Sequence, residues 1–157
     1  MEKEDLSETG EQIARRWLPA ILEGVARYTD EEQQAAIMEL CGASCGRHDI
    51  DALRRLKELA TDRKERVALI NEHIHWCAPW EWKGDSIGSI CTACGCPLAR
   101  DYGLELSPTF CLCSRGWVKT IFSEAFDADV QVRLVQAIGR GDECCEFVVN
   151  IQETGQG

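Results

Sequence analysis

Five of the chain's ten cysteines lie close together in its second half, at Cys91, Cys94, Cys96, Cys111 and Cys113. Thiolates bind zinc or iron–sulfur clusters in pairs, because two ligands from one turn lose little extra entropy when the metal arrives. The segment CTACG is such a pair, and Cys111 and Cys113 form a second pair if they lie in an extended strand. A closed tetrahedral site uses four thiolates, so the spacing predicts a metal site built from four of these five residues.

Other chemistries also fit this cluster. Cysteine is among the most frequently buried residue types, so the thiols could simply fill a core. They could also form a reversible disulfide or act as a nucleophile, which requires a lowered pKa. Cys113 is the best nucleophile candidate, because it directly precedes a predicted helix whose positive end would favour a thiolate.

A second group, in the segment MELCGASCGRH, contains Cys41, Cys45 and His48. The two cysteines are four residues apart and share a helix face if the helix continues that far. Gly42 and Gly46 predict that the helix frays there, which would free both thiols to approach a metal or one another. They could add to the predicted zinc or iron–sulfur site or be ordinary buried cysteines.

The segment NEHIHWC carries the other two histidines, His73 and His75. In a strand both imidazoles would face one way, as metal-binding pairs do, whereas in a helix they would diverge by about 200°. The preceding pattern is helical, so we interpret them as the end of a helix, where histidine is electrostatically favourable.

The elements that must position these residues divide the chain into two halves. Residues 1–76 are predicted to be mainly helical, with helices from Thr9 to Tyr28, from an Asp30 cap onward, from Ile50 to Ala60 and from Asp62 to His75. Pro19 lies inside the first of these and should kink or split it.

Residues 77–157 form the cysteine-rich α+β half of the same single domain, which spans residues 1–157. A helix is predicted from about Ser114 to Phe126, followed by a hairpin in which DVQVRLVQAI and CCEFVVNI are joined by GRGDE. Cys145, Phe147, Val149 and Ile151 share one face of its second strand. The predicted fold class is therefore α+β, with N-terminal helices, an antiparallel sheet, a packed helix and a C-terminal hairpin.

Composition narrows the partners and the location. The formal charge of −10 would repel phosphate backbones and anionic lipids, and no local basic patch stands out, so we expect no nucleic-acid or membrane partner. The acidic N-terminus lacks the apolar core of a signal peptide, and no apolar run approaches the roughly 20 residues that span a bilayer. A cytoplasmic protein is predicted, in which thiols are normally reduced.

The second half resembles a known family in three segments: CGCPL, TFCLCSRGW and GDECCEFVV. Their order and spacing are similar to those of small cysteine-rich bacterial and archaeal proteins that resemble L-2-amino-thiazoline-4-carboxylate hydrolases and, more distantly, the 4-vinyl reductase domain. Gly141, Asp142, Cys145 and Phe147 match a Gly-Asp-x-x-Cys-x-Phe hairpin, and Cys111, Cys113 and Gly116 match a Cys-x-Cys-x-x-Gly segment. The resemblance covers about residues 90 to 151.

That resemblance implies a 4-vinyl reductase domain-like fold with a small-molecule pocket, in a group whose members bind small ligands, bind metal or open a thiazoline ring. Two functions follow as expectations. The first is a small-molecule-binding protein with a metal or redox-responsive site at Cys91, Cys94, Cys96, Cys111 and Cys113, aided by Cys41 and Cys45. The second is a hydrolase of a small cyclic amidine or thiazoline, with Cys113 as nucleophile or with a base such as His48, His73 or His75 activating water. The apolar faces are compatible with a monomer or a homodimer.

Overall fold

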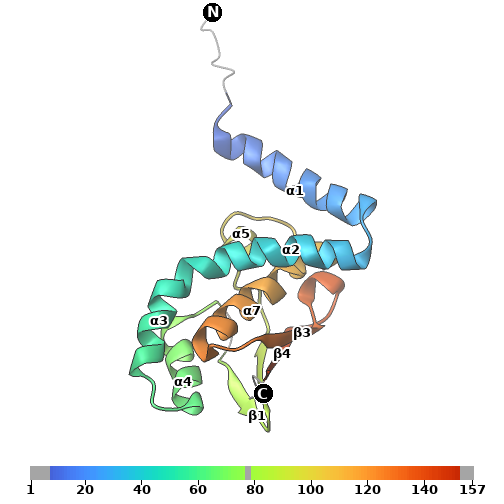
Figure 1. The fold of residues 1–157 in the computed structure, drawn as a ribbon. Helices are drawn as coiled ribbons and strands as arrows, with labels where there is room; N and C mark the ends of the chain where they lie inside the picture. The colour runs from blue at the N-terminus through green and yellow to red at the C-terminus, as the bar shows by residue number, and fades with distance from the viewer. Residues whose placement is uncertain (1–7, 77–78, 153–157) are drawn as a thin grey trace, which may run out of the picture.

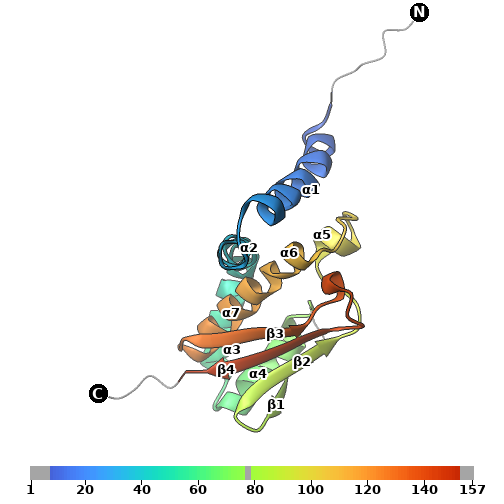
Figure 2. The same ribbon diagram turned by 90° about the vertical axis from the view of Figure 1, so that its right-hand side faces the viewer.

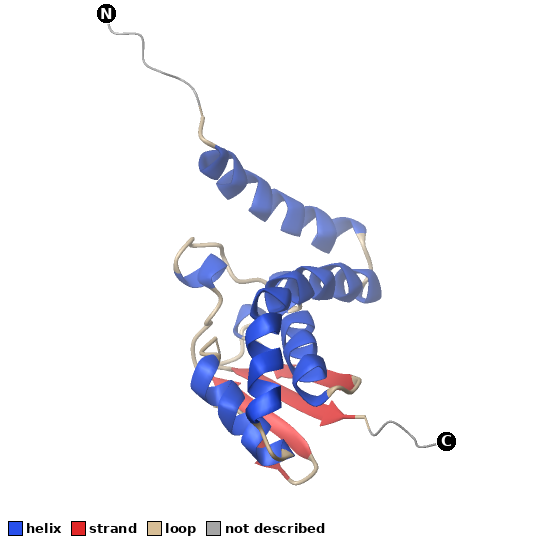
Figure 3. Ribbon diagram, turned by 60° about the vertical axis from the view of Figure 1, so that its left-hand side comes forward, coloured by secondary structure: helices blue, strands red, loops and turns tan. Residues whose placement is uncertain are grey.

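A four-stranded antiparallel sheet lies at the centre of the computed structural model, which describes residues 8–76 and 79–152. The strands are β1 (Glu81–Lys83), β2 (Ser86–Cys91), β3 (Val130–Gln136) and β4 (Cys145–Ile151), in the spatial order β1-β2-β4-β3. Helices pack against one face of this sheet (Figures 1 and 3). The predicted α+β class is confirmed, including the C-terminal hairpin of β3 and β4.

Four helices and a 3-10 turn precede the sheet. They are α1 (Gly10–Tyr28), α2 (Glu31–Gly46), η1 (Arg47–Asp49), α3 (Ile50–Leu59) and α4 (Arg63–His73). Thr9 and Asp30 cap the first two helices with complete capping boxes. In each box the cap side chain accepts from the backbone amide of the glutamine three residues later, and the side chain of that glutamine accepts from the backbone amide of the cap. Pro19 lies inside α1, which is nevertheless one helix rather than two.

The second half adds two short helices that sequence patterning did not indicate, α5 (Pro97–Arg100) and α6 (Pro108–Cys111). After them come α7 (Cys113–Phe126) and, within the hairpin, η2 (Ile138–Arg140). Figure 2 shows α6 and α7 lying in succession above the sheet, with α2 crossing beside them. Among the described helices, none is long and apolar enough to cross a membrane.

The buried face of α7 packs on the sheet and forms the centre of the core. Trp80 meets Phe122 edge-on, with ring centroids 4.8 Å apart, and Phe122 stacks on Phe126. Leu53 from α3 and Ile70 from α4 join the same cluster, so the predicted helical half and the sheet half share one core. The largest core side chains with less than 2% exposure are Leu53, Ile70, Ile87, Val118, Ile121, Phe122 and Val149.

Gly42 of the CGASCG segment does not break α2, contrary to the expectation, and the helix ends only at Gly46. The helix continues to Gly46, and both Gly42 and Gly46 are buried against α7. A Cβ on Gly42 would overlap the carbonyl oxygen of Cys113, and one on Gly116 of α7 would overlap the carbonyl oxygen of Glu39. The glycines therefore let the backbones of α2 and α7 touch, which brings the α2 cysteines beside the start of α7.

Candidate functional site

Most of the cysteines converge on one cavity of about 90 Å³ between α2, the N-terminal part of α7 and the sheet. Every member of the predicted cluster lines it, as does one of the two α2 cysteines. Among the described residues, seven cysteines are therefore on its wall: Cys45, Cys91, Cys94, Cys96, Cys111, Cys113 and Cys145. They come from α2, β2, the loop after β2, α6, α7 and β4, so the convergence arises only in the folded chain.

The rest of the wall is mainly aromatic. Trp76 and Trp117 stack with ring centroids 5.5 Å apart and planes within 9°, and Phe110 and Phe147 also line the cavity. Ser114 adds a hydroxyl, which donates to the carbonyl of Cys111 at 2.6 Å. Within residues 8–76 and 79–152, no aspartate, glutamate, lysine, arginine or histidine contributes to this wall. The cavity is therefore lined by rings and sulfur atoms without a fixed charge.

One polar atom near the cavity lacks a partner. The indole Nε1 of Trp117 is buried and finds no hydrogen-bond acceptor among the described residues. A buried donor left in this way costs about 1–3 kcal/mol unless something accepts its proton. Trp117 lines the cavity through other atoms, so this donor is not open to a molecule in the cavity in this structure.

Two further glycines shape the wall by close approach. A Cβ on Gly95 would overlap the carbonyl oxygen of Trp76, which holds the loop after β2 against the stacked tryptophans. A Cβ on Gly139 would press on the sulfur of Cys111 and the carbonyl oxygen of Ser107. The hairpin turn therefore lies directly over Cys111, and the cavity depends on backbone contacts that other residue types would prevent.

Cys113 is the first residue of α7, one position earlier than the predicted helix start at about Ser114, and the expected lowering of its pKa is wrong. Burial raises the pKa of the Cys113 thiol well above its ordinary value, and the neighbouring Cys96, Cys45 and Cys111 raise it further. Desolvation of a thiolate outweighs the favourable end of the helix here. Cys113 is thus a neutral thiol at pH 7, which disfavours it as a nucleophile.

The pKa values of three other cavity thiols are also raised, in each case mainly by burial. For Cys45 the next cause is the neighbouring Cys96, and for Cys94 a backbone hydrogen bond involving Cys96 opposes the shift. For Cys111 a backbone hydrogen bond from Gly139 opposes it. The cavity therefore presents uncharged sulfur, in keeping with the rest of its wall.

The described residues give no direct support to the predicted metal site. Over residues 8–76 and 79–152, no group of three or more histidine, cysteine, aspartate or glutamate side chains is placed to hold a metal ion. Cys91 is disulfide-bonded, unlike the reduced state that was expected for it. Cys94, Cys96, Cys111 and Cys113 are free thiols on the cavity wall.

The remaining predicted residues lie away from the cavity wall. Cys41 is exposed on α2, although its charge when ionised would act on Cys45 and Cys113. His48 is exposed in η1, and His73 ends α4 with its Nδ1 3.1 Å from the carbonyl oxygen of Leu69. Neither they nor His75 line the cavity, so the hydrolase expectation finds no general base there.

Sequence reasoning missed the aromatic part of the wall and one cysteine. Trp76, Phe110, Trp117 and Cys145 line the cavity but were not among the predicted site residues. The regular spacing of Trp117 with Ile121 indicated burial but could not show which buried positions border a cavity. Only the positions of α6 and the loop after β2 reveal that.

A cleft of about 280 Å³ between α7 and β3 gathers positive charge that the linear sequence did not indicate. Arg115, Lys119 and Arg133 line it together with Glu39, which pairs with Arg115 at 2.8 Å. Within the described chain, Lys119 and Arg133 make no ion pair. These basic residues come from α7 and β3 and are separated in the sequence by other residues, so the sequence shows no basic segment.

Residues 3–155 match a family described as a family of unknown function, DUF6144. The comparison with curated protein sequences finds no significant match.

Solved structures share the fold at low sequence identity. The phenol-responsive sensory domain of the transcription activator PoxR with phenol superposes with a TM-score of 0.56 at 13% identity, over 90% of this chain and 76% of that one. A trafficking protein particle complex subunit 3 from Naegleria fowleri, covalently bound to palmitic acid, gives 0.62 at 15%, over 91% and 95%. A vinyl-4-reductase family protein from Methanocaldococcus jannaschii gives 0.41 at 12%, over 95% and 85%.

Proposed function

Because the chain belongs to the DUF6144 family, whose function is unknown, we propose a function from the geometry of its cavity. The protein binds a small, neutral, largely apolar molecule among the cavity cysteines, and the chemical state of those thiols controls the binding. The observation that carries this proposal is the wall of seven cysteines and four aromatic rings.

The wall defines the class of ligand. A charged ligand would lose its hydration without gaining an opposite charge, which is costly in an apolar site. The cavity, at about 90 Å³, is somewhat smaller than the roughly 150 Å³ apolar cavity that admits benzene. We therefore infer a ligand about the size of one ring or a short chain, carrying a hydroxyl that donates to Oγ of Ser114 on the cavity wall.

Two proteins of the same fold support this class. One was solved with phenol and the other with covalently bound palmitic acid, and both molecules are mainly apolar with one oxygen-bearing end. Their identity to this chain is 15% or less, so they support the kind of ligand and not its identity.

Control by the thiols follows from their position. Oxidation of a cavity thiol to a sulfenic acid or a disulfide, or its ligation of zinc or an iron–sulfur centre, would change the volume and polarity of the wall. Cys45 is exposed and borders the cavity, so it is the thiol that solvent reaches most easily. We propose that such a change lowers the affinity for the apolar ligand.

Titration with phenol, toluene and benzoate tests the ligand class, with tryptophan fluorescence or calorimetry as the readout. We expect phenol to bind, toluene to bind more weakly, and benzoate not to bind. Ala93→Phe should abolish binding, because Ala93 lines the cavity, whereas Thr92→Phe beside it should not. Tight binding of benzoate, or equal behaviour of the two variants, would overturn the proposal.

Control by the thiols needs a separate experiment. Protein purified without oxygen would be analysed for zinc and iron and then titrated with phenol before and after mild treatment with hydrogen peroxide. Weaker binding after oxidation, restored by dithiothreitol, supports thiol control. Unchanged affinity despite a measured loss of free thiols would contradict it and leave only the binding function.

A further inference from the structure

The first helix exposes a continuous apolar face. Trp17 is 64% exposed, Ile21 is 54% exposed and Tyr28 is 77% exposed. Their spacing of four and seven residues places them on one side of α1. Within residues 8–76 and 79–152, the packing of the chain leaves every residue of α1 exposed or only partly buried. Such a patch on a monomer usually marks an interaction site.

The attachment of α1 to the body is narrow. Leu18 and Leu22 pack beside a small cluster of Met38, Leu104 and Phe110. Figures 1 and 2 show α1 projecting beyond the sheet and the other helices. An isolated helix of 19 residues is marginal in water, and a proline in its interior weakens it by about 3 kcal/mol. The exposed face of α1 therefore needs a cover that the described chain does not supply.

The exposed face is free of charge, which is unusual in a molecule with a formal charge of −10. It repeats with a period of seven residues and consists of Trp17, Ala20, Ile21 and Tyr28, together with the partly buried Ile13 and Gly24. Arg16, Glu23 and Arg27 flank it on the same side, and the first two are one heptad apart. Two strongly acidic molecules repel each other, and this uncharged face is where the repulsion would be least.

We propose that the cover is a second copy of this chain, with the two α1 helices packed antiparallel across a two-fold axis. An axis between Pro19 and Ala20 sets Arg16 of each copy opposite Glu23 of the other, so symmetry creates two pairs of opposite charge. In the single chain Arg16 pairs with Glu8 and Glu23 lies 4.0 Å from Arg27. All four side chains are exposed, so exchanging these partners costs little.

Sedimentation equilibrium of the full chain at low salt tests this arrangement. We expect a dimer for the natural sequence and a dimer dissociation constant raised at least about tenfold by Arg16→Glu or by Glu23→Arg. Each single change sets like charges opposite one another at both ends of the pair. The combined variant R16E/E23R restores opposite charges, so its dissociation constant should return to within about threefold of the original.

Two further variants distinguish dimerisation through the α1 face from non-specific hydrophobic association. Trp17→Glu places a charge on the face and should yield a monomer, while Leu59→Glu alters an equally exposed residue on α3 and should leave the dimer intact. Circular dichroism confirms that both fold. A natural chain that stays monomeric at about 100 µM, or a dimer that Trp17→Glu leaves intact, would overturn the proposal. Failure of the double variant to recover would overturn the antiparallel register.

Discussion

Helix α7, which packs on the sheet, and the first helix α1 both carry an apolar stripe at helical spacing. Only the α7 stripe is buried. The α7 stripe is buried between α2 and the sheet, where Phe122 is 0% exposed. The α1 stripe contains Trp17, which is 64% exposed. Hydrophobic periodicity thus indicates a helix in both cases, but it does not distinguish a stripe that builds a pocket wall from one that awaits a partner.

Replacing an aromatic residue by alanine in each helix should give the largest difference in the free energy of unfolding. Phe122→Ala should lower the free energy of unfolding by about 3–5 kcal/mol, because it empties a fully buried site beside Trp80 and Phe126. Trp17→Ala should change it by less than about 0.5 kcal/mol in dilute, monomeric protein. Urea denaturation measures both. Similar losses from the two variants would mean that α1 packs on the body more tightly than its exposure indicates.

A matched pair of glycines sharpens the same contrast. Gly42→Ala should destabilise the protein by about 3 kcal/mol, because its Cβ would overlap the carbonyl oxygen of Cys113 and part α2 from α7. Gly24→Ala in α1 meets nothing within 4 Å and should stabilise that helix by about 0.5–1 kcal/mol. In denaturant titrations we expect the free energy of unfolding to fall for Gly42→Ala and to rise for Gly24→Ala. A neutral Gly42→Ala would show that α2 and α7 can separate without cost.

Local sequence chemistry predicted the elements well. Asp30 and the glutamine three residues later specify the start of α2 through hydrogen bonds within one turn. The Gly-Asp turn and alternating β-branched residues likewise specify the β3–β4 hairpin. These features depend on neighbours in sequence, so they can be read without the fold.

The site was predictable only in part. Cysteine spacing identified six of the seven wall cysteines, because paired thiols stand out in any sequence. The role of Gly42 was misjudged, since a helix-breaking glycine and a helix-packing glycine look alike until the crossing helix is placed. The direction of the Cys113 pKa shift was also wrong, because burial and neighbouring cysteines that are distant in sequence raise the pKa of that thiol.

The raised pKa of Cys113 makes the stability of the body depend on pH in the alkaline range. Its folded value lies above the unfolded value of about 8.5, so the neutral thiol's contribution is complete below pH 8.5 and is lost as pH rises. Relative to Cys113→Ser, the natural protein should lose up to about 1.4 kcal/mol more per pH unit above that point. Cys41→Ser, on the exposed side of α2, should keep the natural slope. Parallel curves for all three proteins would contradict a buried neutral thiol.

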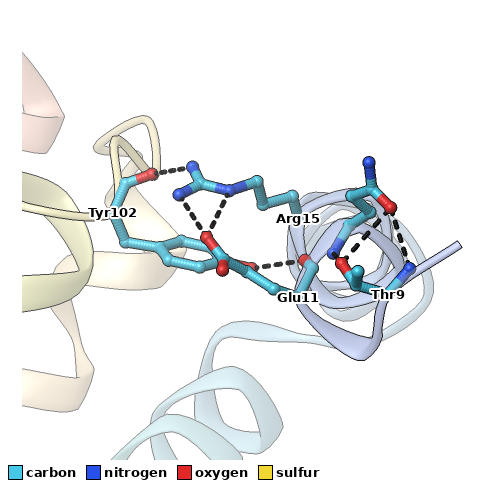
Figure 4. Close-up of polar contacts among 5 residues, drawn as sticks. Thr9, Glu11, Arg15 and Tyr102 are labelled. Atoms are coloured by element: carbon cyan, nitrogen blue, oxygen red, sulfur yellow. Dashed lines mark hydrogen bonds and ion pairs between the residues drawn. The ribbon is translucent and has the colours of Figure 1, made fainter.

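The smallest effect should come from the polar contact that joins α1 to the rest of the chain (Figure 4). Arg15 donates to the carbonyl oxygen of Tyr102 at 2.7 Å, and its guanidinium lies 4.1 Å from the centre of that ring. The Tyr102 hydroxyl donates in turn to the carbonyl oxygen of Glu11 at 3.1 Å.

These groups are exposed, so Arg15→Ala should cost less than about 1 kcal/mol in the free energy of unfolding. It should nevertheless speed amide hydrogen exchange across α1, since a helix with few apolar contacts is held to the body by such links. Arg55→Ala on α3, whose side chain makes no ion pair or hydrogen bond within the described residues, is the matched control and should leave exchange in α1 unchanged. If both variants left it unchanged, the apolar contacts of Leu18 and Leu22 would be sufficient to hold α1 in place, and its exposed stripe would need no second copy to keep the helix folded.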